Sequence, residues 1–110
     1  MKTVLVLGRY GMGEGDPALG VKILGTFLRK SPAIRELQAI VLFNAGVKLA
    51  IEGSPVLIEL LQLHENGVEI HPCGTCLEFF GLKDKVRVGG VSNMDAIISV
   101  LNAAEKVITL

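Results

Sequence analysis

Apolar residues occur along the chain in short runs, separated by stretches rich in glycine, proline and charged side chains. Five of these runs are rich in the β-branched residues that are typical of strands: Lys2–Leu7, Gln38–Phe43, Val68–Pro72, Val86–Val88 and Lys106–Leu110. The run Gln38–Phe43 is almost continuously apolar, which is typical of a strand covered on both faces. The pattern therefore predicts five strands.

Between these runs the apolar residues favour helices. The spacing predicts helices over Pro17–Arg29, Pro55–Glu65 and Gly74–Phe80, and a fourth that ends near Ala104. The expected apolar stripe of the first helix consists of Leu19, Ile23, Leu24, Phe27 and Leu28.

The predicted helices have recognisable start and stop signals. Asp16-Pro17 and Ser54-Pro55 each combine a capping residue with a proline suited to the first turn. The segment Ser92–Asp95 has the pattern of a capping box. Gly67 and Gly81 lie where a helix commonly ends in a left-handed residue. The loop at 44–53 has room for one helical turn, over Val47–Ile51.

The alternation of strands and helices predicts an α/β fold, with a mostly parallel sheet and helices on both faces, in one domain spanning residues 1–110. In such sheets ligands bind beyond the carboxyl ends of the strands. Three unusual loops follow the first three predicted strands: Gly8–Asp16, Asn44–Gly53 and Cys73–Cys76. We expect any chemistry to occur where these loops meet.

Composition narrows the functional classes. The 110 residues include 11 basic and 11 acidic side chains, and these are scattered rather than clustered. This balance argues against nucleic acid and anionic lipid as partners. The apolar runs are shorter than the ~20 residues of a membrane span. Two cysteines do not make a disulfide framework, so a reducing compartment, the cytoplasm, is expected.

Both cysteines lie three residues apart, Cys73 and Cys76, at a predicted strand-to-helix junction. The first turn of a helix presents free N–H groups that favour a thiolate, the reactive form of cysteine. A thioredoxin-like dithiol is disfavoured because every proline precedes the motif. A zinc site needs about four ligands, and only His71 and His64 could complete one. A sulfur carrier and two buried structural cysteines remain open, and no cofactor is expected.

The glycine-rich stretch GRYGMGEGDPALG does not match a nucleotide-binding template. Gly11, Gly13 and Gly15 recur at every second position, and Glu14 and Asp16 put negative charge where phosphates would bind. The stretch is either a flexible turn before a capped helix or a loop that passes close to the cysteines. Lys48 in the next loop is either a solvated side chain or a group near the thiols. His71 is either a partly exposed strand residue or one that faces the cysteine loop.

Four segments, in order along the chain, carry a further signal: GMGEGDPALG, FNAGVKLAIEGS, GVEIHPCGTCLEFFGLKDKVRVGGVSNM and AEKVITL. Together they resemble the DsrE/DsrF-like domain of YedF-type proteins, which are sulfurtransferase-like and linked to selenium metabolism. The resemblance implies a three-layer α/β/α fold with a five-stranded parallel sheet. It also implies homo-oligomers, such as dimers, trimers or hexamers, and partner proteins that donate and accept sulfur. The CPxP motif of the N-terminal domain of YedF-type proteins does not occur in this chain.

The resemblance also distinguishes the two thiols. In this family the carrier cysteine precedes a helix-ending glycine by eight residues, which matches Cys73 and Gly81. Cys73 is then the expected carrier of a persulfide, and Cys76 would assist or resolve it. The expected pocket consists of Gly11, Gly13, Asn44, Lys48, Gly74, Thr75 and Asn93.

Two functions from different classes follow. The first is a sulfur-relay or selenium-relay protein. The second is a non-catalytic oligomeric binding subunit in which the two cysteines form a structural or regulatory disulfide. Metal binding is a third, minor alternative.

Overall fold

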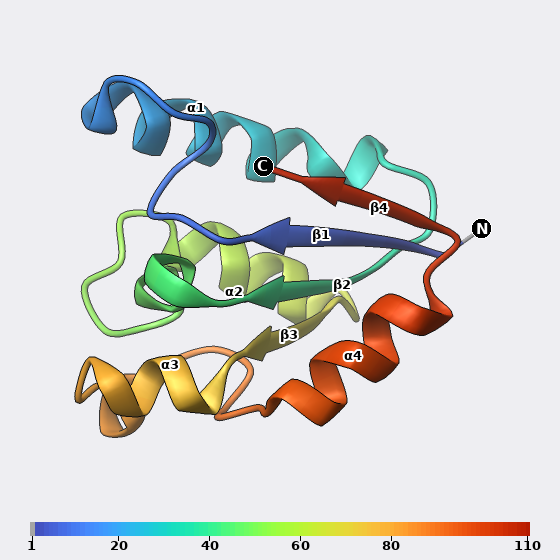
Figure 1. Ribbon diagram of the computed structural model, residues 1–110. Helices are drawn as coiled ribbons and strands as arrows, with labels where there is room; N and C mark the ends of the chain where they lie inside the picture. Colours follow the sequence, from blue (N-terminus) through green and yellow to red (C-terminus); the bar gives the residue numbers. More distant parts are fainter. Residues whose placement is uncertain (1) are drawn as a thin grey trace.

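Four strands form one parallel sheet in the computed structural model, which describes residues 2–110: β1 (Thr3–Leu7), β2 (Leu37–Leu42), β3 (Glu69–Pro72) and β4 (Lys106–Thr109). Their spatial order is β3-β2-β1-β4 (Figure 1). The central strands β1 and β2 are almost entirely apolar, and their residues 4–7 and 39–42 are buried. Strands covered on both faces need such sequences. The predicted α/β fold with a parallel sheet is confirmed.

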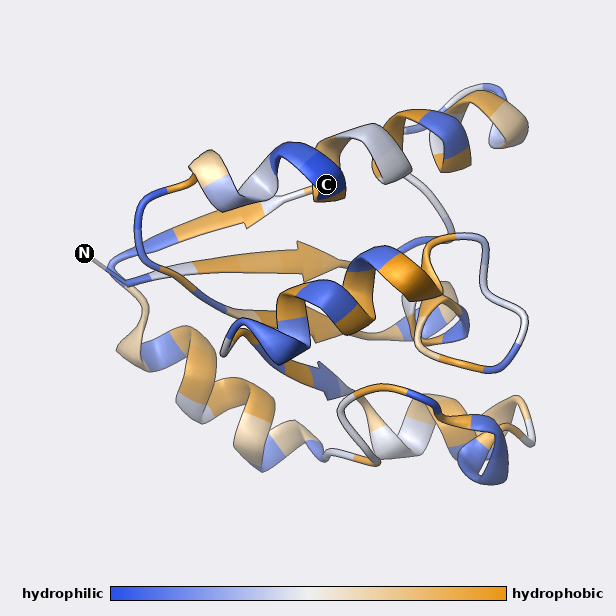
Figure 2. Cartoon of the chain, turned by 180° about the vertical axis from the view of Figure 1, so that it is seen from behind, coloured by the Kyte–Doolittle hydropathy of each residue, from blue (hydrophilic) through white to orange (hydrophobic). Residues whose placement is uncertain are grey.

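Helices cover both faces of the sheet. Helices α1 (Pro17–Lys30) and α2 (Leu57–Glu65) lie on one face, and α4 (Met94–Ala103) lies on the other (Figures 1 and 2). The connections β1–β2 and β2–β3 step across the sheet in one direction, whereas β3–β4 steps back in the other. Right-handed crossovers place helices from opposite steps on opposite faces. The result is three layers.

Helix α1 begins as predicted but buries a narrower stripe. The Asp16 carboxylate accepts a hydrogen bond from the N–H of Leu19, at 2.9 Å, which caps the helix. Leu24 and Leu28 are buried, together with Gly20 and Gly25. In contrast, Leu19 and Ile23 are 54% and 39% exposed. The helix therefore buries the side that carries these glycines and leucines and leaves part of its apolar surface exposed.

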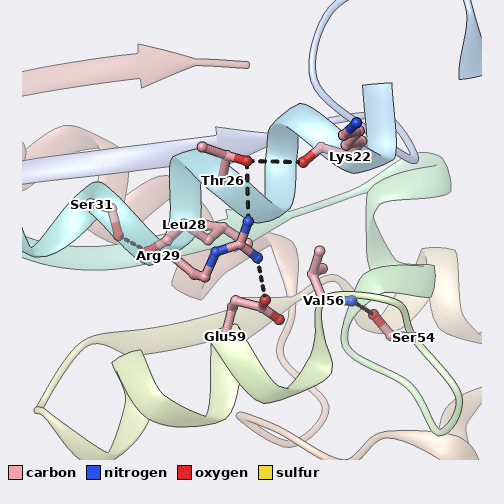
Figure 3. A network of polar contacts seen from close by, with 8 residues as sticks. All are labelled: Lys22, Thr26, Leu28, Arg29, Ser31, Ser54, Val56 and Glu59. Carbon is pink, nitrogen blue, oxygen red and sulfur yellow. Dashed lines mark hydrogen bonds and ion pairs between the residues drawn. The ribbon is translucent and has the colours of Figure 1, made fainter. Parts of the chain in front are cut away.

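Polar contacts join α1 to α2 (Figure 3). Arg29 forms an ion pair with Glu59 of α2, with 2.9 Å between Nη1 and Oε2. Its Nη2 donates a hydrogen bond to the hydroxyl of Thr26 at 3.1 Å. This network fixes the neighbouring helices at the surface.

The prediction of a fifth strand at Val86–Val88 was wrong. Val86 forms a single antiparallel bridge with Ile51, outside the sheet. Gly89 and Gly90 follow with φ values of 82° and 74°, and these left-handed residues turn the chain away. The position beside β3 is instead held by one bridge between Ser92 and Cys73. Residues 2–110 thus form a sheet of four strands.

Two predicted helix starts also needed correction. Helix α2 begins at Leu57 rather than Pro55, because the Ser54 hydroxyl accepts a hydrogen bond from Val56 N–H in a preceding turn. In α4 the cap is Asn93, whose side-chain oxygen accepts from Ala96 N–H at 2.8 Å. Ser92 does not act as a cap because its backbone pairs with the cysteine segment.

Residues 2–110 also contain three short 3-10 helices: η1 (Ser31–Ala33), η2 (Asn44–Leu49) and η3 (Lys83–Lys85). The helical turn expected at Val47–Ile51 is therefore real but begins earlier, at Asn44. Across residues 2–110, none of the helices combines the length and the apolar character needed to cross a lipid bilayer.

Candidate functional site

The two cysteines lie at the start of α3 (Gly74–Phe79), directly after β3. Cys73 immediately precedes the helix, and Cys76 lies in its first turn. Both are free thiols. Cys73 has an exposed fraction of 0%, whereas Cys76 is partly exposed. The expected strand-to-helix junction is confirmed, and the two thiols differ in their access to solvent.

Asn44 contacts the Cys76 sulfur. Its backbone N–H donates a hydrogen bond to Sγ at 3.1 Å. Asn44 is the first residue of η2, and its φ of 51° lies in the left-handed region. Asparagine is one of the few residues besides glycine that commonly adopt this conformation. The loops after β2 and β3 therefore meet at the carboxyl ends of their strands, as predicted.

A close approach between η2 and β1 holds Asn44 in place. A Cβ atom at Gly46 would overlap the carbonyl oxygen of Leu7, so a residue larger than glycine does not fit there. The N–H of Gly46 donates to the carbonyl of Phe43 at 3.0 Å. The position of the N–H that faces Cys76 thus depends on backbone packing against the central strand.

The backbone around Cys73 is held from two sides. Its N–H donates to the carbonyl of Leu42 in β2 at 2.9 Å. On the other side, Gly74 N–H donates to the Ser92 carbonyl, and Ser92 N–H donates to the Pro72 carbonyl, both at 2.9 Å. A Cβ at Gly74 would lie 2.5 Å from the Ser92 oxygen. These contacts fix the backbone on both sides of Cys73, whose side chain is part of the buried hydrophobic core.

The electrostatic environment differs from the expected one. Burial raises the pKa of the Cys76 thiol; the N–H of Asn44 opposes this effect, and the neighbouring Cys73 thiol adds to it. At the helix start, within the part of the chain that the structure describes, the Cys73 side chain makes no capping hydrogen bond. At Cys76, desolvation by burial thus outweighs the hydrogen bond from Asn44 and keeps the pKa of the thiol above its ordinary value.

Lys48 lies over the ring of Phe80, just after α3, rather than free in solvent. Its Nζ is 4.3 Å from the ring centroid of Phe80, which follows α3. Phe80 in turn packs edge-to-face against Phe79, with centroids 5.4 Å apart. Such a cation–ring contact orients the ammonium group. Lys48 also lines an open pocket of about 420 Å³, together with Tyr10, Ile51, Glu52, Gly53 and Ser54.

Other predicted pocket residues lie elsewhere. Gly11 and Gly13 line a separate hollow of about 330 Å³ at the start of α1. Their loop is tied to that helix by the N–H of Met12, which donates to the Gly20 carbonyl at 3.0 Å. Thr75 is exposed on α3, and Asn93 serves as the cap of α4. The structure therefore places Asn44 and Gly74 at the cysteines and Lys48 over Phe80. Thr75 lies between the two cysteines with an exposed side chain, whereas Gly11, Gly13 and Asn93 have separate positions.

The two histidines considered for a zinc site each make other contacts. His71 contacts Glu69 Oε1 through Nε2 at 2.9 Å and Ser92 Oγ through Nδ1 at 3.3 Å. His64, at the end of α2, contacts the Val68 carbonyl. Within residues 2–110, no three His, Cys, Asp or Glu side chains are placed to hold a metal ion. His71 is a partly exposed strand residue.

Comparison with protein families identifies the architecture. The model of the DsrE/DsrF-like family matches residues 4–110, almost the whole chain. The chain belongs to the DsrE/DsrF-like family. No curated protein matches it.

Solved structures share the DsrE/DsrF-like fold of this chain over nearly their whole length. A protein of unknown function from Methanobacterium thermoautotrophicum, MTH1491, is 17% identical with a TM-score of 0.73, covering 99% of this chain and 98% of its own. The ychN protein from E. coli is 17% identical with a TM-score of 0.69, and each chain is covered completely. BT1422 from Bacteroides thetaiotaomicron, of unknown function, is 21% identical with a TM-score of 0.69, covering 99% and 95%. At these identities the likeness concerns the fold.

Within this DsrE/DsrF-like chain, sequence reasoning missed several residues that shape the site: Tyr10, Gly46, Phe80 and Ser92. Phe80 was detectable, because it follows Cys76 by four residues and such pairs lie on one side of a helix. The contacts of Gly46 and Ser92 join segments distant in sequence, and a local pattern does not reveal them.

Proposed function

We propose that this DsrE/DsrF-like protein is a sulfur-relay protein of the YedF type, which carries a sulfane sulfur, or selenium, as a persulfide or its selenium equivalent. The carrier is Cys73, as the eight-residue interval to Gly81 implies, and Cys76 is the second thiol. The observation that carries the proposal is the pair of free thiols at the β3–α3 junction, with the Asn44 N–H directed at one sulfur. The family, associated in general with sulfur relay, supports the same assignment.

The chemistry needs a thiolate and a sulfur donor. A deprotonated thiol attacks the outer sulfur of a donor persulfide, the donor S–S bond breaks, and the donor leaves as a thiolate. Sulfur is transferred without net oxidation or reduction, so no cofactor is required. Proteins with accessible thiols would act as donor and acceptor, and a reducing compartment such as the cytoplasm would keep both cysteines free.

The test is to incubate the reduced protein with glutathione persulfide and to measure its intact mass. We expect a gain of about 32 Da, one sulfur atom, that is reversed by dithiothreitol. The double variant Cys73→Ser/Cys76→Ser is the negative control and should gain nothing. An unchanged mass of the wild-type protein under these conditions would falsify the proposal.

The second candidate function is a non-catalytic oligomeric subunit whose cysteines form a structural or regulatory disulfide. Two observations favour it: Cys73 is buried, and burial raises the pKa of Cys76. Both features reduce thiol reactivity. A persulfide-free protein that forms a Cys73–Cys76 disulfide under mild oxidation, and returns to the dithiol on reduction, would support this function over sulfur relay.

A further inference from the structure

The two thiols differ in their exposure to solvent. This matters because a sulfur donor must bring its S–S bond into line with the attacking thiol. Cys73 is 0% exposed, and its segment is held by hydrogen bonds to Leu42 on one side and Ser92 on the other. A donor protein reaches such a sulfur only after local opening of this backbone. Cys76 is partly exposed in the folded state.

We propose that Cys76 receives the sulfane sulfur from the donor and passes it inward to Cys73, where it is stored. This inference rests on the proposed sulfur-relay function and assigns an order to its steps. The family resemblance assigns the carrier role to Cys73 and lets Cys76 assist or resolve, but it does not make Cys76 the point at which sulfur enters.

The contact of Asn44 suits Cys76 to this role. Its N–H lies 3.1 Å from Sγ and stabilises negative charge there. Charge develops on this sulfur twice: when the thiolate attacks the donor, and when it leaves during transfer to Cys73. The N–H of Asn44 therefore assists both steps.

The transfer between the cysteines balances without an outside reagent. Cys73 and Cys76 lie three residues apart, at the cap and in the first turn of α3, and the Cys73 thiol contributes to the raised pKa of Cys76. The Cys73 sulfur attacks the outer sulfur of the Cys76 persulfide, a new S–S bond forms on Cys73, and the S–S bond on Cys76 breaks. The electron pair remains on Cys76 Sγ, which takes up the proton released by Cys73. The products are a Cys73 persulfide and a Cys76 thiol.

Storage at Cys73 has a physical advantage. A persulfide at an exposed position reacts with water-borne oxidants and thiols, whereas one enclosed by backbone is shielded. The proposed order of transfer also predicts that the sulfur returns from Cys73 to Cys76 before an acceptor takes it, because Cys76 is the thiol exposed to solvent.

The experiment compares the initial rates at which glutathione persulfide adds one sulfur to the wild-type protein, Cys76→Ser and Cys73→Ser. We expect Cys76→Ser to load at least about tenfold more slowly, because opening must precede attack on Cys73. Cys73→Ser should load at a rate close to wild type, but its adduct, on Cys76, should be removed faster by dithiothreitol. Glu78→Gln, an exposed position on α3, is the matched control and should load normally.

The outcomes separate the two proposals. If the wild-type protein gains no sulfur, the sulfur-relay function fails. If the wild-type protein loads and Cys76→Ser loads equally fast, the function stands and the order of transfer is overturned. A second measurement does not depend on variants: iodoacetamide should label Cys76 of the folded wild-type protein before Cys73, and equal labelling rates would contradict the order.

Discussion

At the residue scale, Cys76 and Asn44 determine the properties of the site. One backbone N–H faces a sulfur that burial otherwise makes harder to ionise. A Cys-x-x-Cys motif read alone favours a reactive thiolate at a helix start. For Cys76 the surroundings favour the neutral thiol instead. Desolvation raises its pKa, and the residues that cause the desolvation come from other parts of the chain.

The first prediction concerns the ionisation of Cys76. In Cys73→Ser, alkylation of Cys76 by iodoacetamide should reach half of its maximal rate at a higher pH in the folded protein than in urea. Burial raises the pKa of the folded-state thiol, and the loss of Cys73 removes only lesser contributions. A folded-state midpoint below that of the unfolded chain would show that the Asn44 hydrogen bond dominates.

The same shift affects stability. A folded-state pKa above the unfolded one means that protonated Cys76 contributes to stability below the unfolded-state pKa, and that this contribution is lost as pH rises through the folded-state pKa. The wild-type protein should therefore lose more stability than Cys76→Ser in urea titrations above the unfolded-state pKa. Parallel curves for the two proteins would contradict the shift.

The second prediction concerns the backbone of Asn44. Asn44→Gly should keep the stability and the Cys76 reactivity of the wild type, because glycine tolerates a φ of 51° and retains the N–H. Asn44→Val should cost about 1–2 kcal/mol, because a β-branched residue is strained there. Urea unfolding and alkylation rates measure both effects. Similar results for the glycine and valine variants would show that the left-handed conformation is unimportant.

At the element scale, the packing of η2 against β1 positions the site. Side-chain periodicity predicted the strands and the long helices, including the Asp16 cap of α1. It wrongly predicted a strand at Val86–Val88, because two valines on either side of Arg87, before two left-handed glycines, form only a local bridge with Ile51. Short segments are determined by their neighbours more than by their own pattern.

The third prediction tests the approach of η2 to β1. Gly46→Ala should destabilise the protein by about 1–3 kcal/mol or more, because its Cβ would overlap the Leu7 carbonyl oxygen. Gly53→Ala is the matched control: its Cβ meets open space, and only its φ of 84° imposes a cost, about 1 kcal/mol. Urea unfolding gives both values. Equal losses in the two variants would show that η2 can move away from β1 at little cost.

At the scale of the whole molecule, apolar surface remains uncovered on α1. Met12, Ile23, Phe27 and Ile34 line a groove of about 410 Å³ with Thr26, Lys30 and Ser31. Leu19, one turn before Ile23, is 54% exposed. Uncovered apolar surface of this kind commonly marks an interface, and the family resemblance implies homo-oligomers.

The fourth prediction is that the chain self-associates through this face. Light scattering coupled to size-exclusion chromatography should give a mass above that of one chain for the wild type. Ile23→Lys should shift the mass towards the monomer, because a buried lysine lacks a partner for its charge. Ile58→Lys, on the exposed surface of α2, is the matched control and should leave the mass unchanged. A monomeric wild-type protein would overturn the prediction.

The sequence by itself determined the elements and the location of the chemistry: an α/β chain whose only two cysteines lie at a strand-to-helix junction. These features depend on local patterns, namely hydrophobic periodicity, capping residues and motif spacing. Tertiary structure alone decided which thiol is accessible, which backbone N–H faces it, and that Val86–Val88 does not form a strand. The physical reason is that burial, pKa and close backbone contact depend on residues distant in sequence. Leu42 and Ser92 hold the backbone at Cys73, while Asn44 and Gly46 shape the surroundings of Cys76.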